Sequence, residues 1–291
     1  MIQTQDFTKG VIWKQLLFFF FPILIGSFFQ QLYNTVDTII VGQAVGTSAL
    51  AAVGSTGNLT NLIVNFYVGL STGASVVIAQ YYGAQNNKKI HQAVHTSYIL
   101  AIVSGILMML FGLFFSYQCL DAIGTPHDIL NDATLYMQLY FLCMIPGAIY
   151  NIGAGILRAV GDSKRPLYYL IVCSIVTVVF DFIFVVFFHQ GIAGAAIATV
   201  IAQSVCAILV TIQLMRTNEV YKKKKKKMIF HLPVLKKIIM IGAPAGIQST
   251  MYSISNIVLQ SHINAFGTQT IASWSVYVKI DALFWMMIAA I

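Results

Sequence analysis

The chain has 291 residues, of which 58% are hydrophobic and only 9% are charged. About a quarter of the residues in a soluble domain are charged, so this composition indicates an integral membrane protein. The net charge of +8 could suggest nucleic-acid binding, but six of the positive charges form one run, Lys222 to Lys227. In a membrane protein such a run is typical of a cytoplasmic loop, and no nucleic-acid partner is expected.

Each crossing of the bilayer needs about 20 apolar residues. On this basis the sequence predicts seven complete helices and the start of an eighth, which makes an all-α polytopic fold. Their ranges are 15–41, 53–82, 96–120, 132–158, 166–188, 191–215 and 238–264, with the eighth from 274 onward. Three spans contain proline and should bend there, at Pro22, Pro146 and Pro244. Close helix approach is expected at glycines of the second and fourth spans, Gly69, Gly73, Gly147, Gly153 and Gly155.

The first span carries polar residues on one face. Ser27, Gln30, Asn34 and Asp37 recur at three- and four-residue steps, which is the period of a helix. A carboxylate at membrane depth costs several kcal/mol, so Asp37 is expected to have a functional role.

The same stretch returns later in the chain. An offset of 222 residues pairs Pro22 with Pro244, Ser27 with Ser249 and Asn34 with Asn256, whereas Asp37 falls opposite Leu259. Weak internal repeats of this kind are typical of secondary transporters. They predict an N-terminal six-helix lobe at 1–216, a cytoplasmic Lys-rich linker at 217–237 and an incomplete start of a second lobe at 238–291.

A complete second lobe would need about as many residues as the first, but only about 60 follow the repeat boundary. The chain is therefore expected to be a fragment that needs the missing C-terminal lobe as a partner and does not transport alone. The polar face of the seventh span is expected to lack partners; it comprises Ser249, Ser253, Asn256 and Gln260.

Basic residues predict the orientation. If the N-terminus is cytoplasmic, all but Lys279 of the 17 Lys and Arg residues fall on the cytoplasmic side.

A second acidic residue, Asp181, lies inside the fifth predicted span, with Thr177 one turn before it. The sixth span places Ala195, Thr199 and Gln203 on one face, and the short connection makes these two spans antiparallel neighbours. Two carboxylates, a hydroxyl and backbone carbonyls could bind Na⁺ or hold a proton, and the residues alone leave both open. Serine, threonine and asparagine residues in spans more often serve only to hydrogen-bond helices together.

Signatures of soluble catalysis are missing from the sequence. It contains no GxSxG, HExxH, Walker A or strand-linked GxGxxG motif, so the protein is not expected to be an enzyme or to hold a cofactor. Without a nucleotide-binding domain, any pumping by this chain should be driven by an ion gradient.

Four segments resemble the multidrug and toxic compound extrusion (MATE) family. They are VDTIIVGQAVGTSALAAVG (36–54), GLSTGASVVIAQYYGA (69–84), GILRAVGDSKRP (155–166) and FDFIF with GIAGAAIAT (180–199). The resemblance implies twelve helices in two bundles that form a V around a central cavity. It also implies export of small cationic or amphipathic compounds in exchange for Na⁺ or H⁺.

The resemblance further implies which residues do this. Asp37 and Asp181 would be the cation-coupling carboxylates, with the Ala195 carbonyl and Thr199 beside them and Na⁺ as one candidate ion. Thr177 stands where the family often has Asn, and Tyr252 stands where some members carry a glutamate. Polar groups of the cavity would come from Gln30, Asn34, Gln203 and Asn256.

These patterns predict a multi-pass antiporter of the cytoplasmic membrane that works by alternating access. One alternative is a flippase for lipid-linked precursors, which should have basic residues along its cavity. The first six predicted spans offer none. A channel would not account for the repeat, and a non-functional transporter fragment is the remaining alternative.

Overall fold

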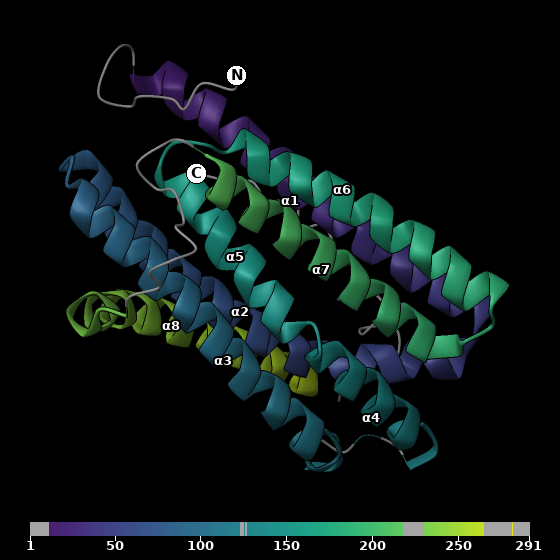
Figure 1. Ribbon diagram of the computed structural model, residues 1–291. Helices are drawn as coiled ribbons and strands as arrows, with labels where there is room; N and C mark the ends of the chain where they lie inside the picture. Colours follow the sequence, from purple (N-terminus) through teal and green to yellow (C-terminus); the bar gives the residue numbers. More distant parts are fainter. Residues whose placement is uncertain (1–11, 123–124, 126, 218–229, 265–280, 282–291) are drawn as a thin grey trace.

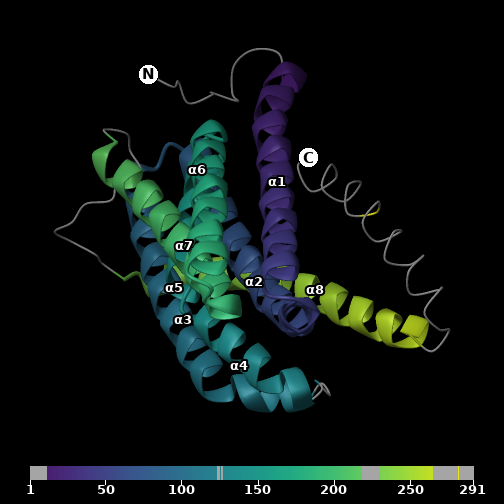
Figure 2. The same ribbon diagram turned by 90° about the vertical axis from the view of Figure 1, so that its right-hand side faces the viewer.

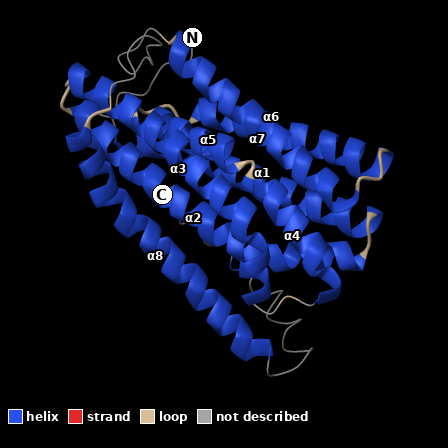
Figure 3. Cartoon of the chain, turned by 60° about the horizontal axis from the view of Figure 1, so that its bottom comes forward, coloured by secondary structure: helices blue, strands red, loops and turns tan. Residues whose placement is uncertain are grey.

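A computed structural model describes residues 12–122, 125, 127–217, 230–264 and 281. Figure 1 shows helices joined by short connections, and Figure 3 shows only helix and loop in this described part of the chain. The helices are α1 (Ile12–Ala44), α2 (Thr47–Gly83), α3 (Asn87–Ala122), α4 (His127–Phe141), α5 (Met144–Ala159), α6 (Lys164–Asp181), a π-helical turn η1 (Phe182–Phe187), α7 (Gly191–Arg216) and α8 (Leu232–Asn264).

Membrane-length helices dominate the first bundle. Five described helices are long and apolar enough to cross a bilayer, and α4 with α5 can make a sixth crossing. Large apolar side chains on their outer faces are exposed, among them Leu107, Phe114 and Ile175. Such faces suit lipid rather than water, so this is a multi-pass membrane protein with a six-helix N-terminal bundle. The eighth predicted helix falls mostly outside the described residues.

The predicted fourth span is broken in two. Helices α4 and α5 meet at a bend of 46°, with Leu142 and Cys143 between them. Pro146 explains the position of the bend, because it has no N–H to donate to the carbonyl four residues earlier, at Leu142. The bend therefore precedes the proline, and Pro146 itself lies in the first turn of α5, where proline is tolerated.

Helices α6 and α7 are packed neighbours, as the short connection predicted (Figure 1). The first helix, α1, rests mainly on α6, where Gly26 faces Leu167 and Leu170 at ordinary contact distance. The main core lies between α2, α3, α4, α5 and α7 and includes Ile78, Tyr98, Phe141, Ile156 and Leu214.

The most extensive helix interface in the described part joins α2 to α8. Two pairs of glycines let the backbones approach: a Cβ on Gly69 would lie 2.2 Å from the Cα of Gly246, and one on Gly73 would lie 2.6 Å from the Cα of Gly242. The predicted close approach at Gly69 and Gly73 is therefore confirmed. Helix α5 also has close contacts at Gly153 and Gly155, but the prediction for Gly147 is wrong, because nothing lies within 4 Å of a Cβ there.

The interface also corrects the prediction that the polar face of the seventh span lacks partners. The Asn65 amide on α2 donates a hydrogen bond to the Ser253 hydroxyl on α8 (3.0 Å). The Ser249 hydroxyl donates within its own helix to the Ala245 carbonyl (3.0 Å). Helix α8 begins at Leu232, so the end of the interval predicted as a linker is helical.

Candidate functional site

The N-terminal bundle encloses a cavity of about 910 Å³. This is large enough for a drug-sized molecule. The described residues of its wall come from α1, α2, α4, α5, α6 and α7. Helix α8 packs along α2.

The polar face predicted for the first span lines this cavity. Ser27, Gln30, Asn34 and Asp37 all contribute to its wall, and so does Pro22. The helical period of the sequence was enough to identify this face, because α1 is one uninterrupted helix through these residues.

The two predicted carboxylates meet at one end of the bundle. Asp181, the last residue of α6, is completely buried, and its side chain lies close to that of Asp37. No described residue donates a hydrogen bond to either oxygen of Asp181 or to Oδ1 of Asp37. The single ion pair among the described residues, Arg165 with Asp162, involves neither carboxylate.

This arrangement has a clear chemical consequence. Two adjacent carboxylates with no basic partner repel each other when both are ionised, and burial strengthens the repulsion. A shared proton or a bound cation removes it. The described residues contain no cluster of three or more His, Cys, Asp or Glu side chains that would mark a metal centre.

The other predicted ligands are distributed over α6 and α7. Thr177 is 2% exposed, and its hydroxyl donates to the Cys173 carbonyl (3.0 Å), which leaves the oxygen lone pairs available. On α7 the Thr199 hydroxyl donates a hydrogen bond to the Ala195 carbonyl (3.1 Å). The two groups predicted to bind the coupling ion are therefore hydrogen-bonded to each other. Gln203 lines the cavity, and its buried Oε1 accepts no hydrogen bond from a described residue. Asn256 is on α8, and its side chain is outside the described part of the structure.

Sequence reasoning missed the aromatic wall of the cavity. Tyr33 on α1, Tyr136 and Tyr140 on α4, and Tyr150 on α5 all line it. Tyr136 is buried and lines the same cavity as Asp37. Its ring stacks on that of Tyr140, with centroids 6.2 Å apart. The signal was present as Tyr33 one turn before Asp37, and as two tyrosines four residues apart in the fourth span.

Arg158 corrects a second expectation, that the first six spans place no basic residue along the cavity. It belongs to the last turn of α5 and lines the cavity. The prediction failed because it ended the span at this residue and assigned the side chain to the following loop. The absence of basic residues therefore no longer argues against a flippase.

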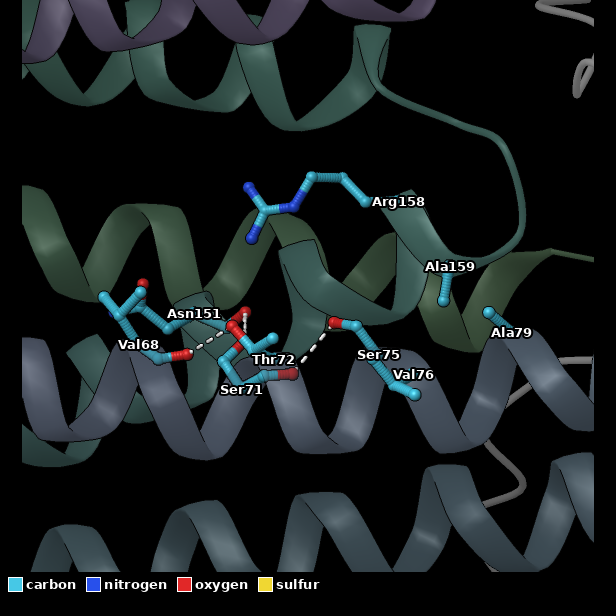
Figure 4. Close-up of a pocket in the computed structure, with 9 residues that line it drawn as sticks. All are labelled: Val68, Ser71, Thr72, Ser75, Val76, Ala79, Asn151, Arg158 and Ala159. Carbon is cyan, nitrogen blue, oxygen red and sulfur yellow. Dashed lines mark hydrogen bonds between the residues drawn. The ribbon is translucent and has the colours of Figure 1, made fainter. Parts of the chain in front are cut away.

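A smaller hollow of about 300 Å³ lies between α2 and α5. Figure 4 shows its lining, with serine and threonine side chains of α2 on one side and Arg158 of α5 on the other. Val68, Asn151 and Arg158 border both this hollow and the main cavity.

Comparison with known proteins is consistent with this architecture. A family model described as MatE matches residues 22–183, more than half of the chain. The probable multidrug resistance protein YoeA of Bacillus subtilis (strain 168) is 28% identical over 96% of this chain and 63% of its own length. The chain thus spans less than two thirds of that relative.

Solved structures share the fold. A MOP superfamily transporter from Pyrococcus furiosus Vc1 (DSM3638), described as having a binding pocket of reverse polarity, superposes with a TM-score of 0.90 at 26% identity. An outward-facing multidrug resistance MATE transporter gives 0.91 at 25% identity. Both matches cover 99% of this chain and 65% of the other. With its fold, its cavity and the matched family model, the chain belongs to the MATE family of membrane transporters.

Proposed function

We propose that this chain carries the coupling site of a cation-driven antiporter that exports cationic or amphipathic compounds. The observation that carries the proposal is the Asp37–Asp181 pair: Asp37 lines a drug-sized cavity, and the pair has three buried oxygens without a hydrogen-bond donor among the described residues. Carboxylates at membrane depth are costly and mark ion or substrate pathways. The relatives named as multidrug resistance and multidrug export proteins support the same substrate class.

In the proposed mechanism the cationic ligand and the coupling ion compete for the negative charge of the Asp37–Asp181 pair. With the pair free of Na⁺ and protons, its charge attracts a cationic ligand into the cavity, and the tyrosine faces add cation–π attraction. When Na⁺ or a proton binds the pair, this attraction is lost and the ligand is released. Asp37 belongs to α1 and Asp181 to α6, so the same event changes how these helices pack. Alternating access then couples ligand release to ion entry.

Orientation and lobe boundaries complete the proposal. The distribution of Lys and Arg supports a cytoplasmic N-terminus in the cell membrane. Residues 1–216 would form the first lobe, 217–237 the cytoplasmic connection, and 238–291 the beginning of the second lobe. Thr177, Ala195 and Thr199 would be auxiliary oxygen ligands, and Gln30, Asn34 and Gln203 would contact the transported compound.

Ligand binding by the chain itself tests this function. The purified 291-residue protein in lipid nanodiscs is titrated with tetraphenylphosphonium, a permanent organic cation. Asp37→Asn and Asp181→Asn keep the side-chain shape and remove the charge, so each should weaken binding by about tenfold or more. Asp132→Asn, at an exposed position on α4, is the matched control and should bind like wild type. Unchanged tetraphenylphosphonium binding in both Asp37→Asn and Asp181→Asn would refute the proposed role of the carboxylate pair.

A further inference from the structure

Arg158 lies between two hollows, and the proposed cation-binding function gives it no role. It lines both the 910 Å³ cavity and the 300 Å³ hollow between α2 and α5. Figure 4 shows its side chain extending from α5 on the side of the hollow opposite the polar residues of α2. The guanidinium is therefore accessible to a molecule inside the cavity.

The charge of Arg158 has no partner among the described residues. Arg165, seven residues later, pairs with Asp162 at 3.0 Å, but no described carboxylate lies within ion-pair distance of Arg158. A partly buried cation is costly when it is unpaired. This cost is offset if an anionic group occupies the site during the working cycle.

The position of Arg158 is fixed by close packing. Gly155, one turn earlier, has no side chain, and a Cβ there would lie 2.5 Å from the Ser75 Oγ and 2.8 Å from the Ser71 Oγ. Helix α5 can thus approach the serines of α2, and this contact holds its last turn against the hollow.

The hydrogen bonds already formed around the small hollow determine which donors remain for a ligand. The Ser71 and Ser75 hydroxyls donate to the carbonyls of Asn151 and Ser71 (both 2.8 Å), and the Thr72 hydroxyl donates to the Val68 carbonyl (2.9 Å). These three hydroxyl hydrogens are already donated to carbonyls, so the hydroxyl oxygens can only accept further hydrogen bonds. The Asn151 amide donates one hydrogen to the Gly147 carbonyl (2.9 Å) and keeps the other. The donors left for an anion are this N–H and the guanidinium of Arg158.

The carboxylate pair and Arg158 lie toward opposite ends of α6. Asp181 ends α6, whereas Arg158 precedes the start of α6 at Lys164. An 18-residue helix such as α6 is about 27 Å long. A single cavity lined by both Asp37 and Arg158 suits an elongated molecule that carries charges of both signs.

We propose that Arg158, with Asn151, forms an anion-recognition subsite that binds the carboxylate, sulfonate or phosphate group of an amphoteric organic substrate. This inference rests on the proposed function, because it assumes that the cavity receives the transported compound. Arginine suits this role, since its planar fork binds a carboxylate or phosphate through two parallel hydrogen bonds.

A matched pair of dyes tests the subsite. Rhodamine 110 has a free carboxylate, and rhodamine 123 is its methyl ester with the same cationic fluorophore. Binding of each is measured by fluorescence anisotropy with the 291-residue protein in phosphatidylcholine nanodiscs. Arg158→Gln should weaken rhodamine 110 binding about tenfold and change rhodamine 123 binding less than about twofold. Arg158→Lys should give an intermediate loss, because it keeps the charge but not the fork. Arg216→Gln, at an exposed arginine that ends α7, is the control and should bind both dyes like wild type.

The outcomes separate this inference from the proposed function. If neither dye binds the wild-type protein, both the anion subsite and the proposed function are refuted. If both dyes bind and Arg158→Gln weakens them equally or not at all, the subsite is refuted while the cation site stands.

Nanodiscs with phosphatidylglycerol distinguish a lipid phosphate from a soluble anion as the natural occupant. Competition by this lipid that disappears in Arg158→Gln would support the subsite and identify a lipid headgroup. Rhodamine 110 binding that depends on Arg158 but not on the lipid would support it for a soluble substrate.

Discussion

Helices α1 and α8 occupy corresponding places in the internal repeat, yet they are packed in different ways. Both contain a proline inside the helix, at Pro22 and Pro244. Helix α1 lines the cavity and rests on α6, whereas α8 packs against α2 over the most extensive helix interface in the described part of the chain. Figure 2 shows the two helices running in clearly different directions.

Small residues account for the difference. At the positions that correspond to Gly242 and Gly246 of α8, the 222-residue offset places Phe20 and Leu24 in α1. The glycines let α8 contact the backbone of α2, and α1 has larger side chains at the corresponding positions. Helix α8 thus forms a close-packed interface with α2, which we call the α2–α8 joint, and the polar face of α1 lines the cavity.

The largest expected effect comes from filling the α2–α8 joint. Gly69→Ala would place a methyl group 2.2 Å from the backbone of Gly246. Since backbone atoms cannot move aside easily, we expect the free energy of unfolding to fall by about 3 kcal/mol. Chemical unfolding in detergent micelles, followed by tryptophan fluorescence, measures this change.

Gly57→Ala is the matched control, because Gly57 lies in the same helix and nothing is within 4 Å of its added Cβ. It should be neutral or slightly stabilising through helix propensity. Equal losses in the two variants would show that the joint is not close-packed.

A smaller effect is expected from the polar contact of the joint. Asn65→Ala removes the donor to Ser253 and should lower the free energy of unfolding by about 1 kcal/mol. A double-mutant cycle with Ser253→Ala should show a coupling energy of about 0.6 kcal/mol. The same cycle with Ser249→Ala should show none, since Ser249 bonds only within α8. Zero coupling to Ser253 would argue against the contact.

The smallest effect concerns α1, where the same type of substitution should be tolerated. A Cβ on Gly26 would lie 3.5 Å from Cδ2 of Leu170, which is an ordinary van der Waals contact. Gly26→Ala should therefore stabilise the protein by about 0.5 kcal/mol, because alanine loses less conformational freedom on folding. A loss as large as that of Gly69→Ala would mean that α1 and α8 are packed alike.

The sequence predicted features that depend on local periodicity. It identified the membrane spans and the cavity face from Ser27 to Asp37, because one helix displays them at a fixed period. Its pairing of α6 with α7 followed from their short connection. It missed Arg158, because the prediction ended the span at that residue, and it missed the Asn65–Ser253 bond, because residues 188 positions apart meet only through tertiary packing. The π-helical turn after Asp181 also had no sequence signal that we recognised.

Competition between ligand and coupling ion tests the central claim most directly. Binding of tetraphenylphosphonium to the purified protein is measured at increasing Na⁺ concentration in alkaline buffer and, separately, at decreasing pH without Na⁺. If the Asp37–Asp181 pair couples the ion, wild-type affinity should fall as the coupling ion, Na⁺ or H⁺, becomes more concentrated, and Asp37→Asn should lose this dependence. An affinity that is independent of both ions in the wild type, or that responds equally in Asp37→Asn, would contradict the account.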